Sequence, residues 1–353
     1  MAAAECKPLN IRVVESESKM QNIQKINILP SGAGNSPVQF AKLFPIILSL
    51  VYGLIVSGVR DYRFYDYQNY IDYVTHSEYM LTSNLIDSFL VVVANEPIWL
   101  LLNIGLNGVF EPEVAVRWVV AISAFLTVWR YLTHDVKNIW FLLLFLCLPI
   151  VVKNNLVHVR QGVGISILIA TWFSGSKTHR WLGLLIAMLV HSSVAFLVVI
   201  YAVSVLLERW RIPMVYGILV YCCYGFLLSY GLEAIASVVG ARQSQEYDFK
   251  ASLFSGSGFI FWMMILIILL FEEFHSRKSS HYGIGILICY LTTYWFIEVS
   301  SRIFESGLLL VLPYGCRLVG FKKWLFVAMI VFYANYMWLS RLSQPLLGFE
   351  AAY

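Results

Sequence analysis

Long apolar runs separated by short polar stretches make up most of the chain after residue 42. Many of the runs approach the ~20 apolar residues that an α-helix needs to cross the hydrocarbon core of a bilayer. The candidate segments are 43–59, 85–106, 114–131, 138–157, 161–174, 181–206, 212–231, 257–271, 282–299, 303–316 and 324–340. The pattern predicts an all-α, polytopic transmembrane helical bundle with about 9–11 apolar segments.

Two of these segments are interrupted by polar residues. Asn95-Glu96-Pro97 breaks the segment 85–106, and His191-Ser192-Ser193 breaks the segment 181–206. Irregular backbone survives at membrane depth only where protein or a water-filled cavity surrounds it. We therefore expect either segment to form a re-entrant or surface-lying helix pair.

The charges between the apolar segments predict the topology. Short basic connections lie at 130–137, 177–180, 208–211, 277–278 and 322–323, and two longer stretches of mixed charge lie at 60–84 and 232–256. The positive-inside rule places the short loops in the cytosol and the long stretches outside. These positions cannot all hold if every candidate segment crosses the membrane once, so one of the interrupted segments is expected not to cross. If all segments do cross, Arg160 would lie near the cytosolic face. We expect 1–42 to be a disordered cytosolic tail, 43–342 the transmembrane domain and 343–353 a C-terminal tail.

Composition supports a membrane protein and excludes several other classes. Hydrophobic residues make up 59% of the chain and charged residues 13%, against roughly 25% charged residues in a soluble domain. The net charge of +4 is small for a nucleic-acid-binding surface. The sequence contains no Cys-x-x-Cys pair and no Asp-x-Asp, Walker or hydrolase motif. We therefore expect no metal, no cofactor and no nucleic-acid partner, and a substrate that is already activated and carried by a lipid.

Two ionisable residues lie inside or at the end of apolar segments, where charge is costly and usually functional. Arg160 presents a planar guanidinium that matches phosphate oxygens, and we expect Gly164, on the same helical face, to leave open space over it. A snorkelling arginine at a span end is the structural alternative. His191 lies at the break of an over-long segment, although a lone histidine in an apolar helix is more often a packed group.

Two further charged residues have both a functional and a structural interpretation. Glu96 needs a partner or a cavity in its apolar segment, but it could also cap the helix that Pro97 begins. Arg302 has Glu298 four residues before it and Glu305 three residues after it. If one helix face carries all three, a self-neutralising intrahelical pair is expected, with a phosphate contact as the alternative.

The polar stretch 60–84 is rich in tyrosine and aspartate. A stripe at helical spacing predicts an amphipathic helix in the membrane interface. It consists of Tyr62, Tyr65 or Asp66, Asn69 or Tyr70, and Tyr73. An interfacial anchor is the structural interpretation. In the functional interpretation, Asp66 orients or deprotonates a hydroxyl and the tyrosine faces carry sugar rings.

The order of these motifs resembles the EpsG-like family of bacterial exopolysaccharide polymerases, relatives of the Wzy-type O-antigen polymerases. The resembling features span about 43–340 and are Gly58-x-Arg60 followed by Asp66-Tyr67-x-x-Tyr70, Glu96-Pro97, Arg160-Gln161-Gly162, Ala187 with His191-x-Ser193, and Arg302. The chain departs from the family in its long polar N-terminal tail and in Val163, where a small alanine is expected. Neither departure affects the charged positions.

The resemblance implies a multi-pass glycosyltransferase of the bacterial inner membrane, GT-C-like in architecture and metal-independent. Such a polymerase joins oligosaccharide repeat units carried on undecaprenyl diphosphate, on the outer face, in exopolysaccharide, capsule or O-antigen biosynthesis. A flippase and a chain-length regulator are the expected protein partners. The expected catalytic residues are Arg160, His191, Asp66 and Glu96, and the expected substrate-binding residues are Arg60, Tyr67, Tyr70, Gln161, Ser193 and Arg302.

The chemistry of these residues suggests their roles. Arg160, assisted by His191 and Arg302, would stabilise the negative charge that develops on the leaving diphosphate. Asp66 or Glu96 would orient or deprotonate the acceptor hydroxyl. The main alternative is a transporter, such as a flippase for lipid-linked oligosaccharide, but duplicated halves are not evident in the sequence. A membrane acyltransferase with a histidine base is a second alternative, and no second acid or histidine is obvious near His191 in sequence.

Overall fold

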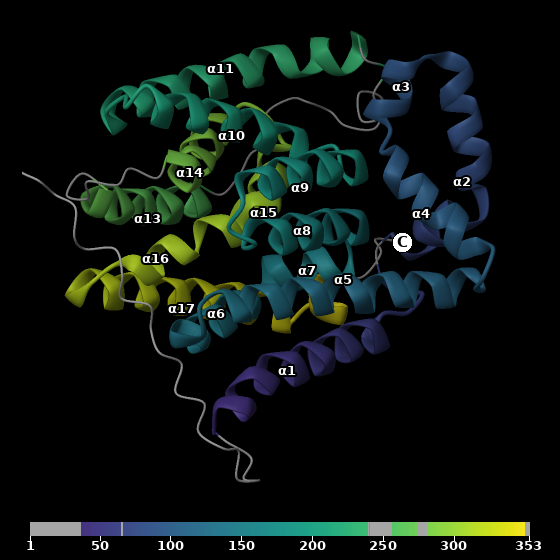
Figure 1. The fold of residues 1–353 in the computed structure, drawn as a ribbon, viewed down its shortest axis with the longest axis horizontal. Helices are drawn as coiled ribbons and strands as arrows, with labels where there is room; N and C mark the ends of the chain where they lie inside the picture. Colours follow the sequence, from purple (N-terminus) through teal and green to yellow (C-terminus); the bar gives the residue numbers. More distant parts are fainter. Residues whose placement is uncertain (1–36, 65, 239, 241–255, 274–280, 350–353) are drawn as a thin grey trace, which may run out of the picture. The chain divides into compact units, whose positions relative to one another are not determined.

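The computed structural model describes residues 37–64, 66–238, 240, 256–273 and 281–349. Contacts divide the chain into residues 1–40 and residues 41–353, and the second unit contains the helical bundle. Within the described ranges, the regular elements are α-helices and two 3-10 turns, without a β-strand. The predicted all-α bundle is therefore confirmed (Figure 1).

The helices follow one another with short connections. In chain order they are α1 (Pro37–Val59), α2 (Tyr67–Asp87), α3 (Phe89–Ala94), α4 (Pro97–Asn107), α5 (Pro112–His134), α6 (Ile139–Leu146), α7 (Pro149–Leu156), α8 (Val159–Trp172), α9 (Lys177–Val190), α10 (Val194–Arg209), α11 (Met214–Val238), α13 (Ser257–Glu273), α14 (His281–Thr293), α15 (Ser300–Val311), α16 (Pro313–Arg317) and α17 (Gly320–Leu342). The 3-10 turns are Val136–Asn138 and Pro345–Gly348.

Local sequence explains where several helices begin and end. Pro97, Pro112, Pro149 and Pro313 stand in the first turns of α4, α5, α7 and α16, where a missing N–H group costs no hydrogen bond. Segment 85–106 is broken between α3 and α4, and segment 181–206 is broken between α9 and α10. Both predicted breaks are confirmed.

Helix length differs from the eleven apolar segments of the sequence. Among the described residues, three helices, α5, α11 and α17, are long and apolar enough to cross a membrane. The bent pair Val136–Leu146 and Pro149–Leu156 would make a fourth span with a bend of 72°. Other helices are shorter, such as the 14-residue α8 and α9. Short helices with irregular ends are tolerated in a membrane protein where other helices surround them.

The stretch 60–84, expected as a polar loop with an amphipathic helix, is mostly the helix α2. Its tyrosine stripe faces protein rather than an interface: Tyr70 and Tyr73 contact the Trp99 ring edge-on, with centroids 5.9 and 6.0 Å apart. Tyr62 precedes the helix and is exposed. Most of the expected tail 1–42, residues 241–255 of the second polar stretch and the chain end 350–353 lie outside the described residues.

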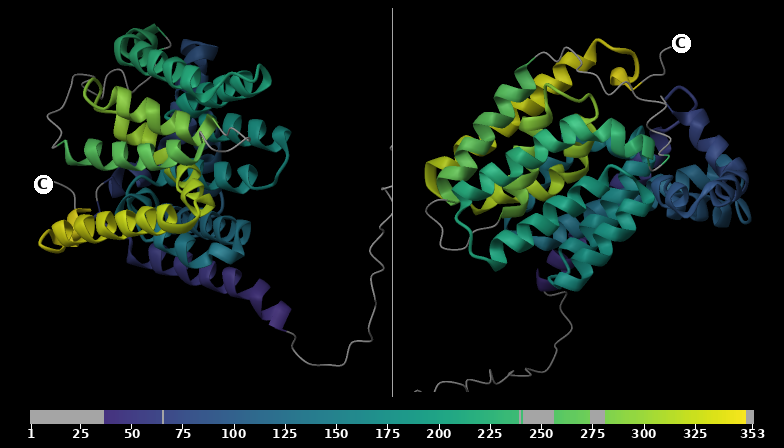
Figure 2. Two further views of the ribbon diagram at one scale, coloured as in Figure 1. Left: turned by 90° about the vertical axis from the view of Figure 1, so that its left-hand side faces the viewer. Right: turned by 90° about the horizontal axis from the view of Figure 1, so that it is seen from above.

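Consecutive helices of the bundle run between two ends. α8 runs from Val159 to Trp172, α9 returns from Lys177 to Val190, and α10 leaves again from Val194 to Arg209. These three helices pack side by side (Figures 1 and 2). We call the end with Arg160 and His191 the site end, and the end where α8 finishes and α9 begins the basic end.

Most of the described bundle core falls into two apolar clusters of different size, beside a third, small one. The larger one includes Leu168, Leu197 and Leu308, from α8, α10 and α15. The smaller one includes Tyr70, Trp99, Val159 and Val190, and therefore packs directly around the residues of the site end. Apolar packing on this side fixes the positions of the helix breaks that carry the polar residues.

Candidate active site

The Glu96 carboxylate joins three separate parts of the chain. Its Oε2 lies 2.6 Å from Arg160 Nη1, and its Oε1 lies 3.0 Å from His191 Nδ1. The Ser192 backbone N–H also donates to Oε1, at 3.0 Å. Glu96 is only 3% exposed, so an ionised carboxylate is stable there because cationic groups and N–H donors surround it. The α3–α4 break, α8 and the α9–α10 turn thus meet at one side chain.

Arg160 is held in the first turn of α8 by more than this ion pair. Its Nη1 also donates to the Tyr73 hydroxyl at 3.0 Å, and the guanidinium lies over the Tyr73 ring at 4.9 Å. The side chain is 18% exposed. Arg160 is therefore a fixed, partly accessible cation inside the protein and not a side chain that extends alone toward a lipid headgroup.

His191 is fixed in one orientation by the same carboxylate. An ionised carboxylate can only accept, so His191 donates from Nδ1 to Glu96. Nε2 is buried and has no hydrogen-bond partner within the part of the chain that the structure describes. The expectation of open space over Arg160 at Gly164 is wrong, because a Cβ on Gly164 would lie 3.4 Å from His191 Cβ. Gly164 instead allows α8 to approach the α9–α10 turn.

Cationic groups surround His158, which lies between α7 and α8. Burial, together with the charges of Lys153, Arg302, His191 and Arg160, lowers the pKa of His158 to about 2. The imidazole is therefore neutral. Lys153 and Arg160 each lie beside a carboxylate, so this region brings several cations together with acidic partners.

Asp66 lies at the edge of this cationic region. Its Oδ2 is 4.0 Å from His158 Nδ1, Oδ1 accepts a hydrogen bond from Asn69 at 2.9 Å, and the side chain is 24% exposed. Asp66 and Glu96 have φ angles of 62° and 59°, and among the described residues only five non-glycine residues have positive φ. Left-handed backbone is strained for these residues and tends to occur at functional sites.

Arg60, Tyr67 and Tyr70, expected to bind substrate, form a buried stack beside the site. Arg60 is 0% exposed, and its guanidinium lies 5.0 Å from the Tyr70 ring and 5.8 Å from the Tyr67 ring. None of its guanidinium nitrogens has a hydrogen-bond partner among the described residues. These three residues have almost no exposed surface in this structure, so their direct contact with substrate stays a prediction.

Gln161 and Ser193 connect helices at the site end. Gln161 Nε2 donates to the Arg302 carbonyl and to Ser306 Oγ, both at 3.0 Å. Ser306 Oγ also lies 2.8 Å from Ser193 Oγ. These buried contacts tie α8 and the start of α10 to α15. They place the Arg302 backbone next to the Arg160 turn.

The charges on α15 differ from the expected intrahelical pair. The helix begins at Ser300, so Glu298 precedes it and does not share its face with Arg302. Glu305 instead lies 3.8 Å from Lys153 Nζ of α7. The expectation that one helix face carries Glu298 together with Arg302 is therefore wrong, because the helix boundary could not be located in a continuous apolar pattern. Arg302 and Glu305 do lie on the same helix and their charges interact, so a pairing between these two residues stays a prediction.

Four contributors to this region were not predicted as site residues: Tyr73, Lys153, His158 and Ser192. Tyr73 lies on the tyrosine stripe and Ser192 within the broken segment, so both had a sequence signal. Lys153 and His158 lie seven and two residues before Arg160 in the sequence. Their contribution depends on the α7–α8 turn, which brings them back beside Arg160.

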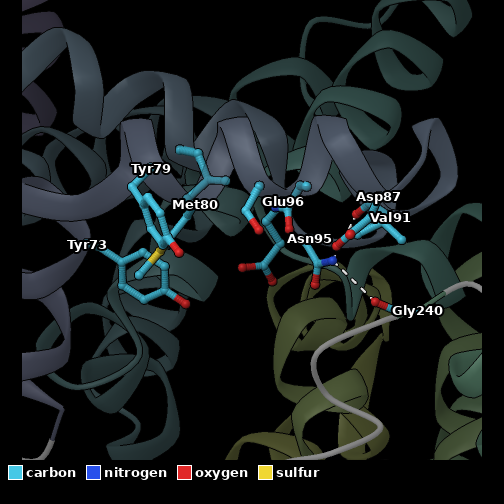
Figure 3. A pocket seen from close by; sticks show the side chains of 11 residues that line it. Tyr73, Tyr79, Met80, Asp87, Val91, Asn95, Glu96 and Gly240 are labelled. Atoms are coloured by element: carbon cyan, nitrogen blue, oxygen red, sulfur yellow. Dashed lines mark hydrogen bonds between the residues drawn. The ribbon is translucent and has the colours of Figure 1, made fainter.

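A cleft of about 300 Å³ opens beside Glu96 (Figure 3). Tyr73, Tyr79 and Met80 of α2 lie on one side of Glu96, and Asp87, Val91 and Asn95 lie on the other. Asn95 Nδ2 donates to the Gly240 carbonyl at 3.3 Å. Ser83, Asn84 and Leu100 complete the lining. The volume and the mixture of aromatic and polar groups suit a polar organic ligand.

Comparison with known proteins identifies the family. The model of the EpsG family matches residues 42–349, which is most of the chain. No curated protein and no solved structure matches. The match covers every charged residue of the site described above, so the chain belongs to the EpsG family.

Proposed function

We propose that this protein joins oligosaccharide repeat units carried on undecaprenyl diphosphate, on the extracytoplasmic side of the bacterial inner membrane. Membership of the EpsG family supports a membrane polysaccharide polymerase in general terms. The observation that carries the more specific proposal is the network of Glu96 with Arg160 and His191, beside an open cleft and among further cations.

The cations suit a diphosphate leaving group. Arg160, Arg302 and Lys153 all act electrostatically on His158, so their charges converge on one region. In the proposed reaction, the bond between the anomeric carbon of the donor sugar and the diphosphate oxygen breaks, and the diphosphate keeps the electron pair. Fixed cations stabilise the charge that develops on that oxygen. Arg160 is the strongest candidate because the guanidinium is oriented by Glu96 and Tyr73.

The cleft suits the saccharide. Tyr79 offers an exposed aromatic face, and Asn84, Asp87 and Asn95 offer groups that hydrogen-bond to hydroxyls. The acceptor hydroxyl forms the new bond to the anomeric carbon and gives up its proton. Of the two candidate acids, Glu96 already accepts hydrogen bonds from Arg160, His191 and Ser192. In the proposed reaction Asp66, which is more exposed, accepts the proton of the acceptor hydroxyl. Glu96 positions Arg160 and His191.

The charge distribution at the two ends of the bundle supports the extracytoplasmic side. α5 ends at Arg130 to His134, α9 begins at Lys177 to Arg180, and Lys323 of α17 donates to Asn138 at 2.8 Å. These basic residues lie at the ends opposite to the site. The positive-inside rule assigns the basic end to the cytosol and therefore the site end to the outside.

A reconstituted reaction tests the proposal. The purified protein in liposomes should convert lipid-linked repeat units, supplied on the side of the site, into a ladder of longer saccharides. Arg160→Ala should lower the rate by roughly 10²–10³, the range found for a lost transition-state donor. Arg209→Ala, exposed at the basic end, is the matched control and should polymerise normally. A normal ladder from Arg160→Ala would contradict the proposed role.

The same assay separates the polymerase from a flippase. A flippase would move the intact lipid-linked unit across the bilayer without changing its length. Only a polymerase would elongate units that are supplied on the correct side from the start. Translocation without elongation would overturn the proposed function.

A further inference from the structure

The basic end carries a cluster of cations that the proposed reaction does not use. We define the basic cluster as Arg130 of α5, Arg180 of α9, Arg317 of α16 and Lys323 of α17. The charges of Arg130, Arg180 and Arg317 all act on the His134 ring, together with that of Asp135. Lys323 and Asp135 both act on Cys316, the residue before Arg317. Four helices thus bring their cationic side chains to one place.

Aromatic rings hold each arginine of the cluster. The Arg130 guanidinium lies over the Trp129 ring at 5.7 Å, and that of Arg180 over the Trp172 ring at 5.1 Å. The Arg317 guanidinium lies over the Tyr314 ring at 4.8 Å. A guanidinium held over a ring by a cation–π contact keeps N–H donors for an acceptor such as phosphate. Arg180 uses one of them, with Nε donating to the Trp172 carbonyl at 3.2 Å.

The positive charge of the cluster is not balanced within the described part of the chain. None of the three arginines forms an ion pair with a described carboxylate. Asp135, the nearby acid, accepts a hydrogen bond from Asn138 at 2.6 Å. Cations that are held together without a counter-charge repel one another, and a bound anion would relieve that repulsion.

Exposed tryptophans indicate the depth of the cluster relative to a bilayer. Trp140, Trp210 and Trp324 are 73%, 66% and 65% exposed, and all three lie at the helix ends that form the basic end. Exposed tryptophans in membrane proteins gather at the headgroup level. An anion that reaches the cluster at this depth is a phospholipid headgroup.

We propose that Arg130, Arg180 and Arg317 bind the phosphate of an anionic phospholipid in the leaflet at the basic end. Basic pockets between transmembrane helices are a recurrent site for such headgroups. The lipid would neutralise the cluster and hold α5, α9 and α16 together. This site lies at the opposite end of the bundle from Arg160 and does not depend on the proposed function.

Native mass spectrometry of the full chain, with phosphatidylglycerol and phosphatidylcholine in equal amounts, tests the site. The wild-type protein should retain phosphatidylglycerol preferentially. The triple variant Arg130→Gln, Arg180→Gln and Arg317→Gln should retain it at least tenfold less, since each arginine near an anionic surface contributes about 1 kcal/mol. The control variant Lys177→Gln, Arg209→Gln and Arg211→Gln removes the same charge from exposed positions at the same end and should retain the lipid.

Three results would overturn the proposal. Equal loss of phosphatidylglycerol in both triple variants would mean that only diffuse charge attracts the lipid. Equal retention of phosphatidylcholine by the wild type would remove the charge preference. Displacement of phosphatidylglycerol by millimolar inorganic phosphate would identify a soluble phosphate as the occupant. If the triple variant does not fold, Arg317→Gln alone, at an exposed position, should still lower retention several-fold.

Discussion

Removing the Glu96 carboxylate would leave the Arg160 guanidinium and the His191 imidazole without their shared acceptor in a largely buried site. Arg160 and His191 both depend on it for orientation, and the Ser192 N–H would lose an acceptor as well. A buried carboxylate with these partners has two separable effects, one on stability and one on the position of Arg160. Two substitutions separate them.

Glu96→Gln should destabilise the protein by about 3–5 kcal/mol, the usual cost of breaking a buried ion pair from one side. The melting temperature in detergent measures this change. The double variant Glu96→Gln and Arg160→Gln should lose less stability than the sum of the two single variants. The reason is that the Arg160 substitution removes the cation that Glu96→Gln leaves unpaired. Strictly additive losses would show that Glu96 does not hold Arg160.

Arg160→Lys should abolish most of the polymerisation although it preserves the charge. Lysine cannot donate to Glu96 and Tyr73 with the planar geometry of a guanidinium. We expect a rate loss on the order of 10²–10³, measured as polymer length and yield from lipid-linked units. If Arg160→Lys polymerised more than tenfold faster than Arg160→Ala, the positive charge alone would account for the role of Arg160.

The cost of burying charge in an apolar environment correctly indicated which residues to examine. Arg160, Glu96 and His191 stand out in the sequence for that reason. Their pairing could not be predicted, because the partners of Glu96 lie 64 and 95 residues away. Arg60 has the same sequence signal but is fully buried against tyrosines. Exposure of a side chain depends on tertiary packing, which a single sequence does not reveal.

At the scale of elements, the α7–α8 turn positions Arg160, and Gly162 permits that turn. A Cβ on Gly162 would lie 2.5 Å from the Asn154 carbonyl oxygen, which belongs to the backbone and cannot rotate away. α7 and α8 therefore approach more closely here than any side chain would allow. His158 and Lys153 stay near Arg160 for the same reason.

Gly162→Ala should separate α7 from α8 and destabilise the protein by about 1–3 kcal/mol, the usual cost of overpacking. The control is Gly105→Ala in α4, where an added Cβ would meet nothing within 4 Å; this change should be neutral or stabilise by up to about 1 kcal/mol. Thermal unfolding of both variants measures the difference. Equal melting temperatures would contradict the close approach.

Helix breaks were predictable, but helix lengths and pairings were not. Asn95-Glu96-Pro97 and His191-Ser192-Ser193 interrupt apolar runs, and the structure breaks at both. In contrast, the continuous run 282–299 did not reveal that α14 ends at Thr293. A continuous apolar pattern carries no boundary signal, so the α15 start and the position of Glu298 could not be located.

For the whole molecule, the separation of the basic end from the site end makes the topology testable. Single cysteines at Tyr79 and Asp87, in the cleft, should react with a membrane-impermeant maleimide added to intact cells. Cysteines at Lys137 and Arg209, exposed at the basic end, should react only after the membrane is opened. The native cysteines must first be replaced. The reverse pattern would place the site in the cytosol and contradict the proposed polymerase.

The sequence separations between the partners of the site also bear on biogenesis. Glu96 meets Ser192 96 residues later, and Gln161 meets Ser306 145 residues later. Glu96 is therefore synthesised long before Ser192, and the contact between Gln161 and Ser306 forms only once α15 has been made. A nascent chain would thus lack the assembled site, and in the proposed reaction it would not consume carrier lipids, so truncated products should be inert.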